Sequence, residues 1–96
     1  MNKAEVISAV EMFKDAFKLI NEANELLMKN GIDLCGVNPK FEHQRKNEVQ
    51  VYSGIDKFAE AYNAGIVVDK YGNYDKWFAV NNVKYFEIAQ PDGTYR

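Results

Sequence analysis

The chain has 96 residues, of which 47% are apolar and 27% charged, and it carries a formal net charge of -2 and one cysteine. This composition excludes a disordered chain and a disulfide framework, and the small charge argues against a basic nucleic-acid module and an acidic nucleic-acid mimic alike. We expect a single domain over residues 1–96. With no apolar run near the roughly 20 residues of a membrane span and no signal-like N-terminus, we expect a cytoplasmic protein with no membrane partner.

Residues 1–31 are predicted to form one long amphipathic helix. Its apolar stripe alternates steps of four and three residues, as one helix face requires: Val6, Val10, Phe13, Phe17, Ile20, Asn24 and Leu27. About 26 helical residues span roughly 39 Å, more than the roughly 32 Å expected across a domain of this length. The simpler expectation is that this wide stripe packs on the chain's own sheet. Alternatively, the helix projects and pairs with a second copy through Val10, Phe17 and Asn24, where Asn24 sets the register as in coiled coils.

Residues 32–48 are expected to form an irregular connection, because Gly, Pro and Asn interrupt any regular period. This segment holds a small basic cluster that a phosphate group would attract: Lys40, His43, Arg45 and Lys46. A unit of the order β-α-β-β-β is expected to follow over residues 49–96. It begins with a short strand at 49–53 and continues with a second helix at 54–64, for which Ser53 and Asp56 have the spacing of a capping box.

Residues 69–88 are predicted to form three strands joined by two tight turns, at 72–73 and at 81–82. Both turns contain Gly or Asn, which tolerate the positive φ angles of two-residue hairpin loops. The turns imply stabilising cross-strand pairs: Asp69 with Lys76, Lys76 with Glu87, and Trp77 with Phe86.

This register gives the predicted sheet two apolar faces, of which the first is expected to lie under the long helix: Ile66, Val68, Trp77, Ala79, Phe86 and Ile88. The second face is rich in tyrosine. Three occupants are open for it: the second helix, a protein partner, or nucleic acid that stacks its bases on the rings. A protein partner would find large rigid side chains with polar tips, and the predicted contacts are Tyr71, Tyr74, Lys76, Phe78 and Tyr85.

The predicted fold class is therefore α+β, in the order α-β-α-β-β-β. A long N-terminal helix and a short second helix pack on an antiparallel sheet of three to four strands. The position of the strand at 49–53 within the sheet stays open.

Motifs for catalysis or cofactor binding are absent from the sequence. Cys35 and His43 are the only soft metal ligands, and two such residues do not make a zinc site. As a catalytic pair they lack an orienting third group, and the sequence contains no glycine-rich phosphate loop and no nucleophile-elbow motif. We expect a protein that is not an enzyme and that binds no metal and no cofactor.

The order of a long N-terminal helix, then EVQVYSGIDKFAEAYNAG, then VNNVKYFEI resembles small accessory proteins encoded by phages and prophages of low-GC bacteria. The resemblance implies a protein that binds and inhibits host machinery, such as CRISPR nucleases and other defence systems. The leading hypothesis is thus a non-enzymatic protein-binding module that occupies a surface of a host protein. The alternative is a nucleic-acid-binding accessory protein that uses the basic cluster and the tyrosine face.

Overall fold

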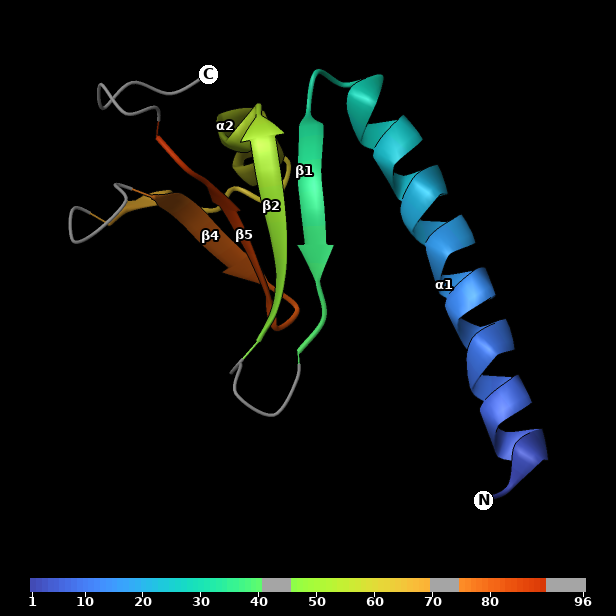
Figure 1. Cartoon of the computed structure of the whole chain (residues 1–96). Coiled ribbons are helices and arrows are strands. Elements are labelled where there is room, and N and C mark those ends of the chain that lie inside the picture. The colour runs from blue at the N-terminus through green and yellow to red at the C-terminus, as the bar shows by residue number, and fades with distance from the viewer. Residues whose placement is uncertain (41–45, 70–74, 90–96) are drawn as a thin grey trace.

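The computed structural model describes residues 1–40, 46–69 and 75–89. Within these ranges the chain forms two helices and five strands, which follow one another in this order: α1 (Lys3–Met28), β1 (Asp33–Asn38), β2 (Asn47–Ser53), α2 (Ile55–Glu60), β3 (Val67–Val68), β4 (Lys76–Val80) and β5 (Val83–Glu87). The predicted α+β class, with one long and one short helix, is confirmed (Figure 1). No helix of the described residues is long and apolar enough to cross a bilayer.

Local signals define both ends of α1. At its start, the side-chain oxygen of Asn2 accepts a hydrogen bond from the N–H of Glu5 at 3.2 Å, and the acidic Glu5 suits the positive end of the helix dipole. At its end, Gly31 takes a left-handed conformation with φ of 77°. The N–H of Ile32 then donates to the carbonyl of Leu27 at 3.0 Å, which closes the helix in a Schellman-type turn.

The sheet differs from the prediction in strand number and direction. Its order is β1-β2-β5-β4-β3 in the described part of the chain, and β2 runs parallel to β5. The additional strand, β1, forms where residues 32–48 were expected to be irregular. Its pairing with β2 shifts register around Leu34 and Gly36, and this irregularity breaks the alternation by which a strand is found in a sequence. An all-antiparallel sheet of three to four strands is therefore wrong.

The two predicted hairpins have different outcomes. The β4–β5 register is confirmed, with Lys76 opposite Glu87 and Trp77 opposite Phe86, and both turn residues at 81–82 have positive φ. Between β3 and β4, however, Lys76 faces Val68 rather than Asp69. This shift of one residue turns Val68 to the opposite side of the sheet. The turn predicted at 72–73 lies outside the described residues.

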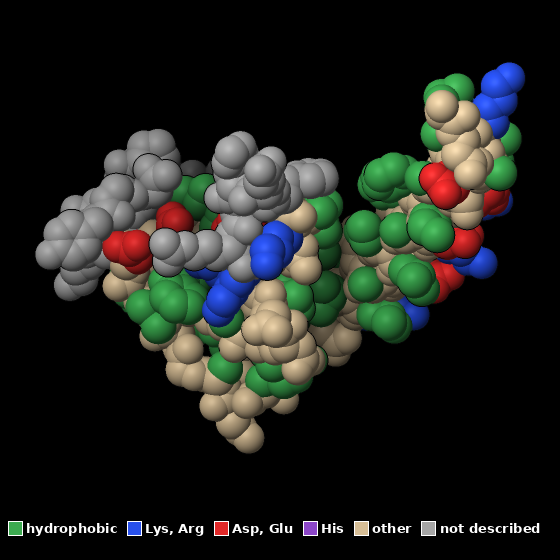
Figure 2. All heavy atoms as spheres, turned by 90° about the horizontal axis from the view of Figure 1, so that it is seen from below, with side chains coloured by type: hydrophobic (Ala, Val, Ile, Leu, Met, Phe, Trp, Pro, Cys, Tyr) green, Lys and Arg blue, Asp and Glu red, His purple; other side chains and the backbone are tan. Residues whose placement is uncertain are grey.

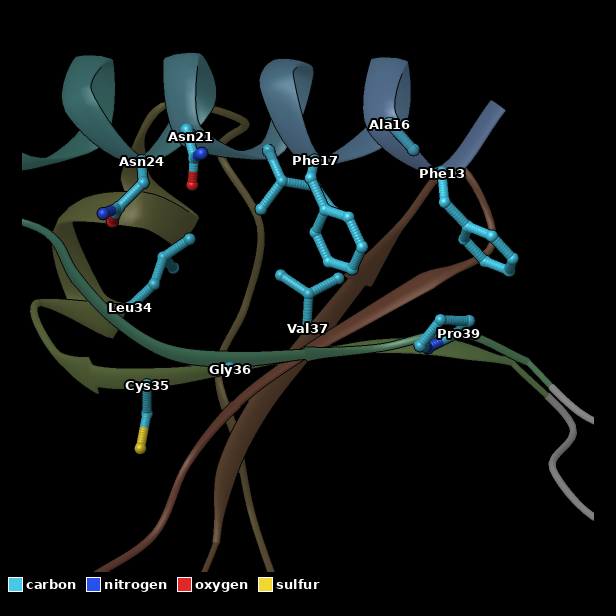
Figure 3. Close-up of a pocket in the computed structure, with 11 residues that line it drawn as sticks. Phe13, Ala16, Phe17, Asn21, Asn24, Leu34, Cys35, Gly36, Val37 and Pro39 are labelled. Carbon is cyan, nitrogen blue, oxygen red and sulfur yellow. The ribbon is translucent and has the colours of Figure 1, made fainter. Parts of the chain in front are cut away.

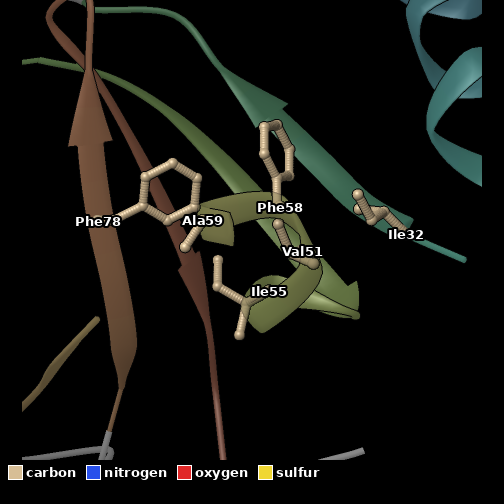
Figure 4. Close-up of a cluster of buried hydrophobic side chains, with 6 residues drawn as sticks. All are labelled: Ile32, Val51, Ile55, Phe58, Ala59 and Phe78. Atoms are coloured by element: carbon tan, nitrogen blue, oxygen red, sulfur yellow. The ribbon is translucent and has the colours of Figure 1, made fainter. Parts of the chain in front are cut away.

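The core lies between α2 and the tyrosine-rich face of the sheet, which holds Phe78 and Tyr85. It consists of Ile32, Val51, Ile55, Phe58, Ala59 and Phe78 (Figure 4). The ring of Phe58 lies 5.3 Å from that of Phe78 and 4.5 Å from that of Tyr85, measured between centroids, and Phe78 and Tyr85 stack at 5.1 Å. Of the three occupants considered for this face, the second helix is therefore the one observed.

The N-terminus of α2 is held differently from the prediction. Gly54 precedes the helix with φ of 92°, and no side chain caps it; the hydroxyl of Ser53 instead donates to Asp33 at 3.2 Å. The buried carboxylate of Glu87 accepts a hydrogen bond from the N–H of Ile55 at 3.4 Å. A Cβ atom at Gly54 would lie 2.5 Å from the carbonyl oxygen of Gly31, so this position needs glycine.

The long helix does not cover the sheet as expected. It contacts the sheet mainly at β1, an edge strand, and it diverges from the strands toward its N-terminus (Figure 1). The tight turn at Gly31 joins α1 directly to β1, and α2 already occupies the apolar face over β4 and β5. The expectation that α1 covers the first face is therefore wrong.

Candidate protein-docking surface

The helix α1 exposes an apolar surface along its length. No residue is buried between Lys3 and Met28, all of which the structure describes. Val10, Phe13 and Phe17 of the predicted stripe are 61%, 64% and 60% exposed. Figure 2 shows apolar side chains over much of the helix, which projects from the rest of the molecule. Helices in proteins gain most of their stability by packing an apolar face, so this stripe is a surface without its expected cover.

The apolar side of α1 is wider than the stripe. A second column with seven-residue spacing, formed by Met12, Leu19 and Leu26, is 61–66% exposed. On a helical wheel, a column of alanines lies between this column and the stripe: Ala9, Ala16 and Ala23. Together the columns cover more than half of the helix circumference. A single flat neighbour cannot bury so wide an arc.

A cavity of about 420 Å³ separates the stripe from the edge of the sheet. It is lined from α1 by Phe13, Ala16, Phe17, Ile20, Asn21 and Asn24, and from β1 and the residues after it by Leu34, Cys35, Gly36, Val37 and Pro39. Figure 3 shows Phe17 and Val37 pointing toward each other across this space, whereas Cys35 points away from it. The walls are mostly apolar, with Asn21 and Asn24 as their polar side chains.

A second cavity of about 360 Å³ adjoins the first and shares Ile20, Leu34 and Val37 with it. It reaches the core side of the sheet at Val49 and Tyr85 and the side of α2 at Phe58 and Tyr62. We call the two cavities together the docking groove. It runs between the two helices, along β1 and β2.

One polar atom in the docking groove lacks a partner. The side-chain oxygen of Asn24 is buried and accepts no hydrogen bond from any described residue. Leaving a buried amide oxygen unpaired costs about 1–3 kcal/mol, so such atoms are rare in folded proteins. Asn24 is therefore a polar side chain of the groove wall whose enclosed oxygen lacks a donor from the described residues.

The predicted contacts on the tyrosine face lie elsewhere. Phe78 is 2% exposed and belongs to the core, so a partner of the folded chain does not reach it. Tyr85 is half-buried under Phe58, and burial, with Tyr62 adding to it, raises the pKa of its hydroxyl. The ammonium of Lys76 lies 3.2 Å from the Asp56 carboxylate. Tyr71 and Tyr74 lie outside the described residues.

The residues predicted for dimerisation share one surface. Phe17 and Asn24 line the docking groove, and Val10 continues their row toward the N-terminus. The expectation that this stripe packs within its own chain holds only at the C-terminal end, where Leu27 packs against the core. Around Phe13 and Phe17 the stripe stands across an open cavity from β1. Dimerisation itself stays a prediction.

The basic cluster is described only in part. Lys40 and Lys46 are exposed, whereas His43 and Arg45 lie outside the described residues. Lys46 lines an open hollow of about 430 Å³ together with Glu48, Trp77 and Lys84. The ammonium of Lys84 lies 5.1 Å from the centroid of the Trp77 ring, within the range of a cation–π contact. This hollow lies on the sheet face opposite to α2.

The described residues contain no cluster of metal-ligating side chains. No three His, Cys, Asp or Glu side chains among them come together as metal ligands would. Cys35 is a free and exposed thiol on β1.

No known family model, curated protein or solved structure matches the chain. The resemblance to phage-encoded accessory proteins therefore stays a prediction. The described residues present three candidate binding surfaces: the docking groove, the exposed side of α1 and the Lys46–Lys84 hollow.

Proposed function

We propose that this chain is a non-enzymatic protein-binding module that docks through the apolar side of α1 and the docking groove. One observation carries the proposal: a helix of 26 residues buries none of them while it exposes two phenylalanines of its apolar stripe. Amphipathic helices and apolar grooves are the standard parts of helix-in-groove recognition between proteins. This chain presents both, side by side.

The energy available at this surface is sufficient for binding. A fully covered aromatic side chain buries about 150–250 Å², so Phe13 and Phe17, at 64% and 60% exposure, each have about 100–150 Å² left to bury. At about 25 cal/mol per Å², each contributes about 3 kcal/mol. Several such side chains offset the loss of freedom on association, which costs at least about 4 kcal/mol.

The proposed partner is a host protein. The resemblance implies a host protein whose activity is blocked when its surface is occupied. A projecting apolar helix suits that role, because it can enter a groove on another protein while the sheet beside it obstructs access.

A photo-crosslinking amino acid at position 17 tests the proposal. Because the Phe17 side chain faces the docking groove, a crosslinker there is expected to form covalent adducts with protein in cells. The matched control is the same crosslinker at Glu22, on the polar side of α1, which is expected to give far fewer adducts. A Phe13→Glu change is expected to suppress the adducts from position 17. Equal adducts from both positions, or none from position 17, would refute the docking surface.

A second candidate function is binding of single-stranded nucleic acid at the opposite sheet face. Lys46 and Lys84 lie in one hollow with Glu48 and the Trp77 ring, which combines a net positive charge with a stacking surface. The Lys46→Ala and Lys84→Ala double variant is expected to weaken binding of a labelled oligonucleotide, and the affinity is expected to fall steeply with salt. Lys29→Ala is the control, and binding that does not respond to salt excludes this function.

A further inference from the structure

We infer that the occupant of the docking groove is α1 of a second copy of this chain, in a two-fold symmetric dimer. The inference rests on the proposed function above only as far as protein binding through this surface, and it takes a second copy, in place of a host protein, as the occupant. The chain carries both a projecting apolar helix and an apolar groove beside it, and both are open. In a two-fold dimer each helix enters the other copy's groove, so one association covers all four surfaces.

The width of the apolar side of α1 favours a second copy. The stripe with Phe13 and Phe17 and the column with Met12, Leu19 and Leu26 point in different directions around the helix. Covering both requires two neighbours. A second copy supplies two of matching character, since its sheet edge at Leu34 and Val37 can pack on one side of the helix and its own α1 on the other.

The exposed area agrees with the size of a stable dimer interface. Nine large apolar side chains of α1 are 50–66% exposed: Val6, Ile7, Val10, Met12, Phe13, Phe17, Leu19, Leu26 and Met28. Covering them removes roughly 600 Å² of apolar surface from water per copy, taking about 60–120 Å² for a full aliphatic side chain and about 150–250 Å² for an aromatic one. The roughly 1,200 Å² from two helices reaches the size at which specific interfaces begin, and the groove walls add to it.

Charge does not oppose this pairing. If the stripe forms the seam, the flanking positions on one side are Ala9, Ala16 and Ala23, whose small side chains let two helices approach closely. On the other side the only charged flank is Lys14, and its ammonium lies 2.6 Å from the carboxylate of Glu11 in the same helix. A net charge of -2 adds little repulsion between copies.

The unpartnered oxygen of Asn24 supports the same arrangement. Asn24 lies at a seam position in the docking groove, and a hydrogen-bond donor from a second helix would satisfy its oxygen once the side chain turns into the groove. Single polar residues at such positions fix the register of helix pairs, because a slipped pairing leaves them buried and unpaired. Asn24 thus serves as the register-setting residue of the dimer.

The mass of the full chain in solution tests the inference. Sedimentation equilibrium at about 100 µM is expected to give twice the chain mass of 11.0 kDa. The Phe13→Glu and Phe17→Glu double variant is expected to raise the dissociation constant by about 100-fold or more, because each change places a charge in the apolar seam. The matched control is Asp15→Gln with Glu22→Gln on the polar side of α1, which is expected to stay dimeric.

The single cysteine provides a second readout. Cys35 is exposed and points away from the groove, so a nitroxide label on it leaves the surface free. By pulsed electron paramagnetic resonance, the wild type is expected to show one distance between the nitroxide labels of the two copies. The charged double variant is expected to show none. Since neither Phe13 nor Phe17 packs against the core, circular dichroism is expected to show that variant folded. The milder Phe17→Ser is expected to weaken the dimer about tenfold.

The outcomes separate the two proposals. A monomeric wild type, or a dimer that survives the charged double variant, overturns the inference. If the monomeric chain still crosslinks to another protein from position 17, the protein-binding function stands and only the partner is wrong. If the monomeric chain forms no such adducts, both proposals fail.

Discussion

Replacing Phe78 by Ala tests whether this residue belongs to the core or to a binding surface. Phe78 is 2% exposed and contacts the rings of Phe58 and Tyr85. Deleting a buried phenylalanine side chain costs about 3–5 kcal/mol, and the two lost ring contacts favour the upper part of that range. Domains of this kind have a total stability of about 5–15 kcal/mol. The change is therefore expected to remove a large part of it.

Urea unfolding followed by Trp77 fluorescence measures this effect. With a slope of about 1–1.5 kcal/mol per M for a chain of this size, a loss of about 4 kcal/mol moves the midpoint down by about 3 M. If Phe78→Ala is too unstable to measure, Phe78→Leu is expected to lose about 1–2 kcal/mol.

Phe17→Ala is the matched control, because it deletes the same side chain from a position that is 60% exposed. At dilutions where the chain is monomeric, it is expected to cost less than about 1 kcal/mol. A smaller loss for Phe78→Ala than for Phe17→Ala would refute the assignment of the core.

Two further predictions concern the turn before α2 and the half-buried tyrosine. Gly54→Ala is expected to lower the unfolding midpoint more than Gly31→Ala: both have positive φ, but the new Cβ meets backbone at Gly54 and only the flexible end of Lys57 at Gly31. Equal losses would contradict this reasoning. Because burial raises the pKa of Tyr85 above its usual value of 10.0, its contribution to stability is complete below about pH 10 and is lost as the pH rises through the folded-state pKa. Tyr85→Phe is expected to flatten this decline, and an unchanged pH profile would show that other groups cause it.

The elements that could be predicted are those specified by neighbouring residues. The spacing of Val6, Val10, Phe13 and Phe17 is sufficient for a helix, and Gly31 is sufficient to end it. The β4–β5 hairpin follows from the two asparagines at its turn and from the pairs on either side of it. Each of these signals lies within one short stretch of the chain, so it can be recognised without knowledge of the rest of the sequence.

The elements that were missed depend on irregular or distant pairing. The strand β1 has a register shift at Leu34, which breaks the alternating pattern. The β3–β4 register differs by one residue from the one that paired Asp69 with Lys76, because each such charge pair contributes only a fraction of a kcal/mol and does not decide the pairing. The parallel contact between β2 and β5 joins segments more than thirty residues apart, as in Gln50 opposite Phe86.

The candidate site could be predicted in part. The stripe through Val10, Phe17 and Asn24 is visible in the sequence as an apolar row with one polar member, and the same residues lie on the exposed side of α1 or line the docking groove. The opposite wall, at Leu34 and Val37, was missed together with β1. Two of the three occupants considered for the tyrosine face, a protein partner and nucleic acid, required it to be accessible. In the structure α2 covers Phe78 on that face.

By itself the sequence determined which segments are amphipathic, where α1 ends and how β4 meets β5, because these follow from contacts along or beside one stretch of chain. Only the tertiary structure decided which helix covers the sheet. Both helices have an apolar side that suits the same face, and periodicity carries no information on which of them reaches it. The tight turn at Gly31 holds α1 beside the edge strand, and α2 packs on Phe78 and Tyr85. This choice leaves the longer helix exposed and creates the docking groove.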